Sequence, residues 1–273
     1  MKKKILLIGK KSFISNNLYF FLKDKFFIKK ISFEMFLKLK KEDLKKYSYI
    51  INCSINKNYI KLKYSYRNDF DYQIAKKLNG LNCKLIFFST RKVYNPGDNL
   101  KENSNLNPKC NYSKNKLITE KYLQYLLKDK VLILRLSNLV DFRNVKNYRI
   151  RHKIFIDYFF ENIKKNNIYK NKSVYKDFLS INQFCKIIYS LISKNIIGVY
   201  NVSIGKKVYI NKLISWLNFY NKKKITVINP PKNINSDSFY LNNKKLRDKI
   251  KLKISLIDLE KDCKTISKNY FLK

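Results

Sequence analysis

Short apolar runs separated by longer amphipathic stretches fill the first half of the 273-residue chain. Such runs are typical of strands in a parallel sheet, because helices cover both faces of the sheet. The stretches between them predict helices at 13–23, 68–78 and 112–127. The predicted strands are 5–8, a run that begins at 26–28, 49–52, 84–88 and 131–134. This alternation predicts βαβ units and an α/β fold, in which the strand ends form a ligand site at one edge.

The regular alternation weakens after about residue 150, where the pattern predicts mainly helices. No linker rich in proline or glycine separates this part from the first, so we expect a lobe packed on the first part. The predicted helices are 152–165, 181–194, 210–220 and 255–270, with short strands near 198–202 and 224–228.

The chain carries a formal net charge of +41, which raises the question of a polyanion partner. Only seven of the 60 basic residues are Arg, the side chain best suited to bidentate recognition of phosphate and guanine. Lys, Asn, Ile, Tyr and Phe abound while Gly and Pro are scarce, as AT-rich coding would produce. The lysines are spread along the whole chain, which favours a solvated surface. A polyanion-binding protein is therefore the less favoured alternative, and no specific nucleic-acid partner is expected.

Cysteine and histidine usage indicates a reducing compartment and argues against metal chemistry. The five cysteines are widely spaced and include no C-x-x-C pair, so we expect no disulfide framework and no metal site. His152 is the single histidine, which disfavours a Ser-His-Asp triad. The apolar run after the basic start is too short for a signal peptide, and no stretch approaches the roughly 18 to 20 apolar residues of a membrane span. We therefore expect a cytoplasmic protein that binds no membrane.

A glycine follows the first predicted strand, where a helix is expected to begin. The dinucleotide fingerprint expected in this fold at this place is G-x-x-G-x-x-G, because glycines allow a tight turn and a close approach of the backbone to the pyrophosphate. Gly9 is kept here, whereas Ser12 and Ser15 occupy the other two positions. A serine hydroxyl can cap the helix or donate to phosphate, although an ordinary capped turn is the alternative. The candidate cofactor-binding residues of this turn are Gly9, Ser12, Phe13 and Ile14.

The residues around the second predicted strand bear on the choice of cofactor. Many NAD sites place a carboxylate after this strand to hold the ribose hydroxyls. Here the nearest carboxylate is that of Glu34, and Lys29 and Lys30 precede it. Lys10 and Lys11 in the preceding turn could face a 2′-phosphate. The pattern therefore favours NADP slightly over NAD.

The strongest candidate chemistry is a tyrosine and a lysine four residues apart, Tyr112 and Lys116, at the start of a predicted helix. This spacing places both side chains on one helical face. A nearby ammonium favours the phenolate, so we expect Lys116 to lower the pKa of Tyr112 from about 10 toward neutrality. Thr90, at the end of the fourth strand, supplies a hydroxyl for the reacting oxygen. The spacing alone is weakly specific, since Tyr59 and Lys63 share it.

The order of these segments resembles that of the extended short-chain dehydrogenase/reductase family, which includes NAD-dependent epimerases and dehydratases and dTDP-4-dehydrorhamnose reductase-like enzymes. The resemblance implies a Rossmann-like doubly wound parallel sheet with a smaller C-terminal substrate lobe. It divides the chain into an NAD(P)-binding domain at 1–150 and a mainly substrate-binding lobe at 151–273. The segments that carry it are 4–18, 50–54, 85–94, 112–122, 133–138, 176–181, 198–202 and 256–259.

The resemblance also implies roles for three residues in catalysis. Thr90 matches the catalytic serine or threonine, which also contacts the substrate, Tyr112 matches the acid/base, and Lys116 matches the residue that binds the nicotinamide ribose. Dehydratases of the family carry an Asp-Glu pair directly after the threonine, whereas this chain has Arg91 and Lys92. Dehydration is therefore disfavoured. The implied function is that of an NAD(P)-dependent oxidoreductase or epimerase that reduces or epimerises a nucleotide-activated sugar.

The same resemblance also implies which residues bind the cofactor and the substrate. Cys53 and Ser54 match a segment that contacts the cofactor, and Asn138 matches an asparagine that contacts the substrate. A basic cluster at 149–152 is a candidate contact for the substrate diphosphate, with a solvated helix start as the favoured interpretation. The sequence leaves open whether the protein forms a homodimer. Because two fingerprint glycines are replaced, a degenerate, non-catalytic nucleotide-binding relative is the alternative function.

Overall fold

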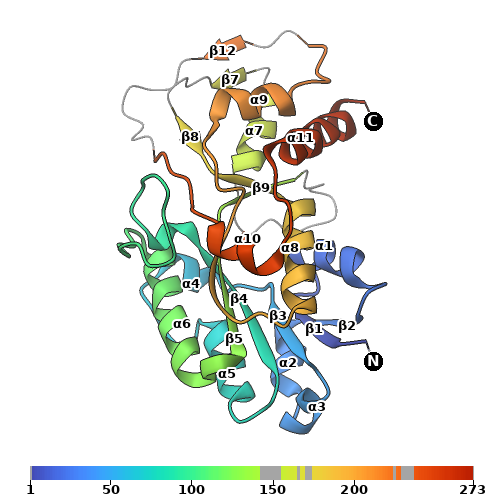
Figure 1. Ribbon diagram of the computed structural model, residues 1–273, viewed down its shortest axis with the longest axis vertical. Helices are drawn as coiled ribbons and strands as arrows, with labels where there is room; N and C mark the ends of the chain where they lie inside the picture. Colours follow the sequence, from blue (N-terminus) through green and yellow to red (C-terminus); the bar gives the residue numbers. More distant parts are fainter. Residues whose placement is uncertain are drawn as a thin grey trace. The chain divides into compact units, whose positions relative to one another are not determined.

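The computed structural model describes residues 2–141, 155–164, 167–169, 174–223, 226–228 and 237–272 (Figure 1). The chain forms two compact units. The first consists of Met1–Asn95, Glu102–Leu136 and Cys185–Asn201, and the second of Pro96–Lys101, Ser137–Phe184 and Val202–Lys273. The chain thus passes between the units several times, which a single boundary near residue 150 does not describe. The division into a cofactor-binding and a substrate-binding part stays a prediction.

A six-stranded sheet forms the centre of the first unit. Its strands are β1 (Lys4–Ile8), β2 (Phe27–Ile31), β3 (Tyr49–Asn52), β4 (Lys84–Thr90), β5 (Val131–Leu136) and β10 (Gly198–Val202). Their order is β10-β5-β4-β3-β1-β2, and the pairs β1–β2, β1–β3, β3–β4 and β4–β5 are parallel. The chain adds β2 on one side of β1 and β3 on the other. Ligands of such sheets bind at this switch point, outside the carboxyl ends of the strands.

Helices cover both faces of the sheet (Figure 1). They are α1 (Phe13–Leu22), α2 (Phe33–Lys38), α3 (Lys41–Lys45), α4 (Lys57–Lys61), α5 (Phe70–Leu78), α6 (Asn111–Leu127) and the C-terminal part of α8 (Ile181–Ser193), with short 3₁₀ turns at Arg91–Val93 and Lys128–Lys130. Alternate residues of each strand face opposite sides. On one side Leu6, Ile50 and Phe87 join Ile74 of α5 and Leu123 of α6 in a single buried cluster. This packing fixes α5 and α6, which carry much of the candidate site.

The second unit contains short strands and amphipathic helices. Its elements are β6 (Asn138–Val140), α7 (Phe155–Lys164), β7 (Asn167–Tyr169), β8 (Tyr175–Lys176), β9 (Phe178–Ser180), β11 (Val208–Tyr209), α9 (Ile210–Leu217), β12 (Thr226–Ile228), α10 (Lys244–Ile250) and α11 (Leu256–Phe271). The strands pair as β6–β9, β7–β12 and β8–β11. The fully buried Asp177 carboxylate accepts hydrogen bonds from the backbone amides of Ile204, Gly205 and Leu241 at 3.1–3.2 Å. This one side chain therefore connects three segments of the unit.

The α/β architecture and the parallel sheet predicted from the sequence are confirmed. Each predicted strand and helix is present, with ends that differ by a few residues; residues 152–154, 165 and 224–225 of two predicted elements lie outside the described part of the chain. The short helices α2, α3, α4 and α10 were not predicted. In the described residues, no helix has the length and apolar character needed to cross a membrane.

Candidate active site

Gly9 forms a tight turn between β1 and α1. Its φ angle is +112°, a region that favours glycine. A Cβ atom at this position would lie 3.0 Å from the carbonyl carbon of Cys53 and 3.1 Å from the amide nitrogen of Ser54. The turn therefore requires glycine, because a side chain would both strain the backbone and collide with the segment after β3.

The first turn of α1 has the properties of an anion site. Ser12 is the N-cap residue, its hydroxyl makes no capping hydrogen bond, and the first turn contains no acidic residue. The first turn of a helix, here the turn that begins with Phe13 and Ile14, carries the positive end of the helix dipole. These features, together with Gly9, fit the pyrophosphate of a dinucleotide.

The two serines of the glycine pattern differ in environment. Ser12 is partly exposed at the turn, whereas Ser15 is completely buried and its hydroxyl has no hydrogen-bond partner among the described residues. Ser15 therefore occupies the place where the third glycine would permit close packing of helix and sheet. A hydroxyl fits into that space, but it is directed into the protein interior, so Ser15 is not placed to contact a ligand at the turn.

The segment after β3 lies beside this turn. Cys53 continues the sheet, because its amide donates to the Ile8 carbonyl at 2.8 Å. Asn52 holds Ser54 by three hydrogen bonds: its Oδ1 accepts from the Ser54 amide (3.0 Å) and hydroxyl (2.7 Å), and its Nδ2 donates to the Ser54 carbonyl (3.1 Å). Burial raises the pKa of the Cys53 thiol, so it is unreactive. The two predicted cofactor contacts thus lie next to Gly9.

Thr90 and Tyr112 come together at the carboxyl end of β4. Thr90 is the last residue of the strand, and Tyr112 lies in the first turn of α6. The side chains of Thr90 and Tyr112 form a hydrogen bond. Lys116 follows one turn later and is buried, with 5% of its surface exposed. The structure therefore brings the three predicted catalytic residues to one place in the first unit.

The predicted effect of Lys116 on Tyr112 is wrong for this structure. Burial raises the pKa of Tyr112 to about 12, and the hydrogen bond with Thr90 only partly opposes this effect. The Lys116 ammonium is instead paired with Asp71, whose Oδ2 atom is 3.9 Å from Nζ. The charge that was expected to stabilise the phenolate is thus next to a carboxyl group, and it does not offset the effect of burial on Tyr112. Tyr112 is therefore protonated at neutral pH.

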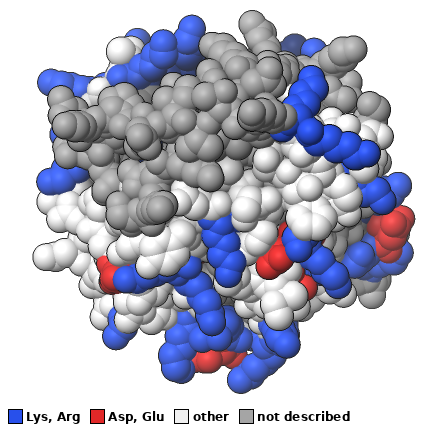
Figure 2. All heavy atoms as spheres, turned by 90° about the horizontal axis from the view of Figure 1, so that it is seen from above, with Lys and Arg blue, Asp and Glu red and all other residues white. Residues whose placement is uncertain are grey.

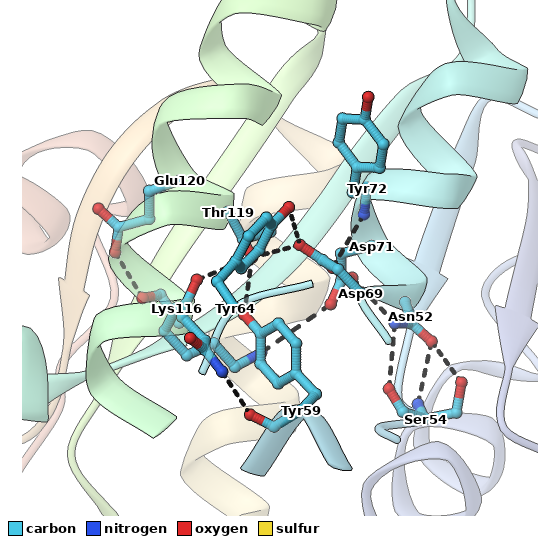
Figure 3. Close-up of polar contacts among 12 residues, drawn as sticks. Asn52, Ser54, Tyr59, Tyr64, Asp69, Asp71, Tyr72, Lys116, Thr119 and Glu120 are labelled. Atoms are coloured by element: carbon cyan, nitrogen blue, oxygen red, sulfur yellow. Dashed lines mark hydrogen bonds and ion pairs between the residues drawn. The ribbon is translucent and has the colours of Figure 1, made fainter. Parts of the chain in front are cut away.

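Two buried aspartates near Lys116 were missed by the sequence analysis (Figure 3). Asp69 caps α5 by accepting the Tyr72 amide at 3.0 Å, and it also accepts hydrogen bonds from Thr119 (2.5 Å) and from a tyrosine hydroxyl. Asp71 is 6% exposed. Burial raises the pKa of both carboxyl groups, and the Lys116 charge opposes this shift. The sequence feature that could have identified these aspartates is an Asp-x-Asp pair at the start of a predicted helix, in a chain with only 19 acidic residues.

Apart from Thr90, the predicted substrate-binding residues either belong to the second unit or lie outside the described part of the chain. The Asn138 side chain donates to the Asp177 carbonyl at 3.2 Å, where β6 pairs with β9. This contact gives Asn138 a role inside its own unit, and its contact with a substrate stays a prediction. The basic cluster at 149–152 lies outside the described residues.

Several solved structures share this fold over nearly the whole chain. A UDP-N-acetylglucosamine 4-epimerase from Methanobrevibacter ruminantium, in complex with UDP-N-acetylmuramic acid, is 20% identical, with a TM-score of 0.82 and 99% of each chain covered. A dTDP-4-dehydrorhamnose reductase from Clostridium acetobutylicum is 14% identical (TM-score 0.78, 98% of this chain and 99% of that chain). A UDP-glucuronic acid 4-epimerase from Bacillus cereus, in complex with NAD, is 15% identical (TM-score 0.76, 98% of each chain). These likenesses confirm the predicted Rossmann-like fold.

A family model described as the NAD dependent epimerase/dehydratase family matches residues 46–203. The matched region includes Thr90, Tyr112 and Lys116. It confirms the resemblance found in the sequence and the prediction of an enzyme of this class. No curated protein matches the chain. Because the model covers more than half of the sequence, the chain belongs to the NAD-dependent epimerase/dehydratase family.

Proposed function

We propose that this protein is an NAD(P)-dependent enzyme that reduces or epimerises a nucleotide-activated sugar. The observation that carries the proposal is the hydrogen bond between Tyr112 and Thr90, with Lys116 one helical turn away. This group of side chains lies in the unit that also contains the Gly9 turn. When bound, the nicotinamide would supply or accept the hydride.

Each of the three side chains has a distinct task in this proposal. Tyr112 is protonated at neutral pH, so its hydroxyl is suited to donate a proton to a carbonyl oxygen of the sugar. Thr90 orients that oxygen through its own hydroxyl. Lys116 makes no hydrogen bond from its ammonium within the described residues, and its three N–H donors are suited to the ribose hydroxyls of the cofactor. Together these roles favour reduction of a keto-sugar.

The choice of cofactor depends on the charges near the end of β2. Ser32, not a carboxylate, follows the strand and caps α2 by accepting the Met35 amide at 3.2 Å. Burial lowers the pKa of Lys30, and the charge of the nearby Lys10 lowers it further. A pair of neighbouring ammonium groups attracts an anion, which supports a modest preference for NADP over NAD.

The substrate class is supported by the structural neighbours. Their complexes contain UDP-N-acetylmuramic acid in one case and, in another, UDP-glucuronic acid together with NAD. Arg91 and Lys92, directly after Thr90, argue against dehydration because they replace the acidic pair of dehydratases.

We include in the proposal a substrate contact by Asn138 and a cytoplasmic location. This location suits five cysteines that are all free thiols. A homodimer stays an open prediction that sedimentation analysis would check.

A dinucleotide titration at physiological salt tests this proposal. We expect NADPH and NADH fluorescence to report binding in the micromolar range, with NADPH preferred. Tyr112→Phe is expected to keep this affinity and to lose about 100-fold or more in turnover of a keto-sugar nucleotide, because the proton donor is removed. A Thr265→Val variant on the exposed side of α11 serves as the control with unchanged activity.

The same measurements test the alternative that this protein is a non-catalytic relative. The replacement of two fingerprint glycines by Ser12 and Ser15 favours this alternative. If the protein binds neither dinucleotide, the proposed function is wrong. If Tyr112→Phe turns over substrate at the normal rate, the assignment of the proton donor is wrong.

A further inference from the structure

The Asp71 carboxylate lies next to the Lys116 ammonium (Figure 3). Asp71 Oδ2 is 3.9 Å from Lys116 Nζ, and the two side chains are only 9% and 7% exposed. The other oxygen, Oδ1, accepts a hydrogen bond from Asn52 Nδ2 at 2.9 Å. Asp71 therefore contacts both the helix that carries Lys116 and the end of β3.

Asn52 extends this contact to the phosphate turn. Its side chain makes the three hydrogen bonds with Ser54 that shape the segment after β3. The Ser54 amide is one of the atoms that leave no room for a Cβ on Gly9. A continuous series of polar contacts thus runs from Lys116 through Asp71 and Asn52 to the segment beside Gly9.

The remaining surroundings of the ammonium are aromatic. Lys116 Nζ lies 4.3 Å from the centre of the Phe87 ring and 5.5 Å from that of Tyr59. Such rings attract a cation but leave its position along the ring face weakly defined. Within the described residues, Asp71 is the carboxylate at salt-bridge distance. It is therefore the group that can fix the position of the ammonium.

We propose that Asp71 is a positioning residue of the active site, which holds the Lys116 ammonium in place and couples it through Asn52 to the phosphate turn. This inference rests on the proposed function, because Lys116 is the residue expected to bind the cofactor ribose. It goes further in assigning a task to a carboxylate outside the Thr90, Tyr112 and Lys116 group.

Electrostatics agree with this arrangement. Burial lowers the pKa of Lys116, and Asp71 is the strongest of the charges that raise it. The Lys116 charge in turn lowers the pKa of Asp71 against the effect of burial. Each partner thus opposes the effect of burial on the other, although burial still raises the pKa of Asp71 to about 7 and lowers that of Lys116. Other titratable groups interact electrostatically with Lys116 or Asp71. They are Asp69, Glu120, Tyr59, Tyr112 and Cys53.

Asp71→Asn tests the proposal, because asparagine keeps an oxygen for Asn52 and loses only the charge. The first readout is the titration of the Lys116 side chain by NMR in protein with ¹⁵N-labelled lysine, assigned by the signal that is missing from Lys116→Met. We expect the pKa of Lys116 to fall by about one unit or more in Asp71→Asn. Asp69→Asn removes a charge from the same cluster but not from the ion pair, so it should shift this pKa less.

The second readout is the affinity for NADPH as a function of pH. We expect wild-type affinity to stay nearly constant between about pH 7 and about pH 9, and that of Asp71→Asn to fall with rising pH as Lys116 loses its proton. If Asp71→Asn does not fold, Asp71→Glu replaces it: the charge is kept but displaced by one methylene. Glutamate should keep Lys116 ionised and weaken NADPH binding.

The outcomes separate this inference from the proposed function. An unchanged Lys116 titration in Asp71→Asn, or wild-type NADPH affinity in Asp71→Glu, would overturn the role of Asp71 while leaving the function intact. Failure of the wild-type protein to bind any dinucleotide would overturn the function, and with it a cofactor-related role. The Lys116 titration needs no cofactor, so it still decides whether Asp71 holds the ammonium charged.

Discussion

At the scale of single residues, burial controls the protonation states of the candidate site. Lys116 and Asp71 are buried and Tyr112 is partly buried, and burial favours the neutral form of each. For Tyr112 no opposing charge is close enough, so its pKa is raised to about 12. The charge of Asp71 opposes the effect of burial on the pKa of Lys116, and the charge of Lys116 opposes it on the pKa of Asp71. The site therefore contains a neutral acid, Tyr112, near a lysine and an aspartate whose charges oppose the effect of burial on each other.

The raised pKa of Tyr112 predicts a particular pH profile. The protonated form is the proton donor, so kcat/KM for keto-reduction should be constant through the neutral range and fall only as the pH rises toward the tyrosine pKa. The reverse reaction needs the phenolate, so its rate should increase with pH over the same range. Steady-state kinetics in both directions checks this. A reduction rate that already falls between about pH 6 and about pH 7 would contradict it.

At the scale of elements, α6 is the helix that organises the site. It carries Tyr112 and Lys116 near its start, and Glu120 anchors it one turn further along. The Glu120 carboxylate accepts three hydrogen bonds from Arg135 of β5, the shortest of them from Nη2 to Oε2 at 2.7 Å, and it also accepts one from the Ser89 hydroxyl of β4. Both charged side chains are at most 5% exposed. These contacts fix the helix on the two strands next to the reacting groups.

Removal of one partner of this pair should be costly. Glu120→Ala leaves the Arg135 guanidinium buried without its carboxylate, and we expect a loss of about 3–5 kcal/mol in the free energy of unfolding. Asp248→Ala is a matched control, because it breaks an exposed ion pair with Lys244 within α10. Urea denaturation should show little change for the control. Equal effects of the two substitutions would show that the buried pair does not anchor α6.

At the scale of the whole molecule, charge is the most unusual property. Among the described residues in the face shown in Figure 2, lysine and arginine side chains are numerous and acidic groups are few. The net charge of +41 attracts any anion at long range, but no specific recognition follows from it. The charge should assist the approach of phosphate-bearing ligands and add little to the selection among them.

Salt is therefore expected to remove binding to generic polyanions. Labelled double-stranded DNA should bind measurably at about 10 mM salt and only weakly at about 150 mM, since the Debye length shortens from roughly 30 Å to roughly 8 Å. Fluorescence anisotropy measures both conditions. Tight DNA binding at physiological salt would favour the polyanion-binding alternative.

The sequence by itself determined the main sheet and the three residues that meet at the candidate site. Strands such as β1 and β3 were predictable because a strand buried on both faces needs a continuous apolar run, and this signal is local. Thr90, Tyr112 and Lys116 were predictable because strand ends and helix starts meet at one edge of a parallel sheet. The short helices α2, α3 and α4 have too few turns for a clear apolar period, so the sequence did not reveal them.

Only the tertiary structure decided how these groups act on one another. Lys116 is four residues from Tyr112 along α6, yet its charge is paired with Asp71 of α5, which is distant in the sequence. Ser15 occupies a fingerprint position, yet its hydroxyl is buried. Local patterns specify which residues lie on a helical face, whereas pKa values and ion pairs depend on desolvation and on neighbours from other elements. Those quantities are therefore fixed only when the chain has folded.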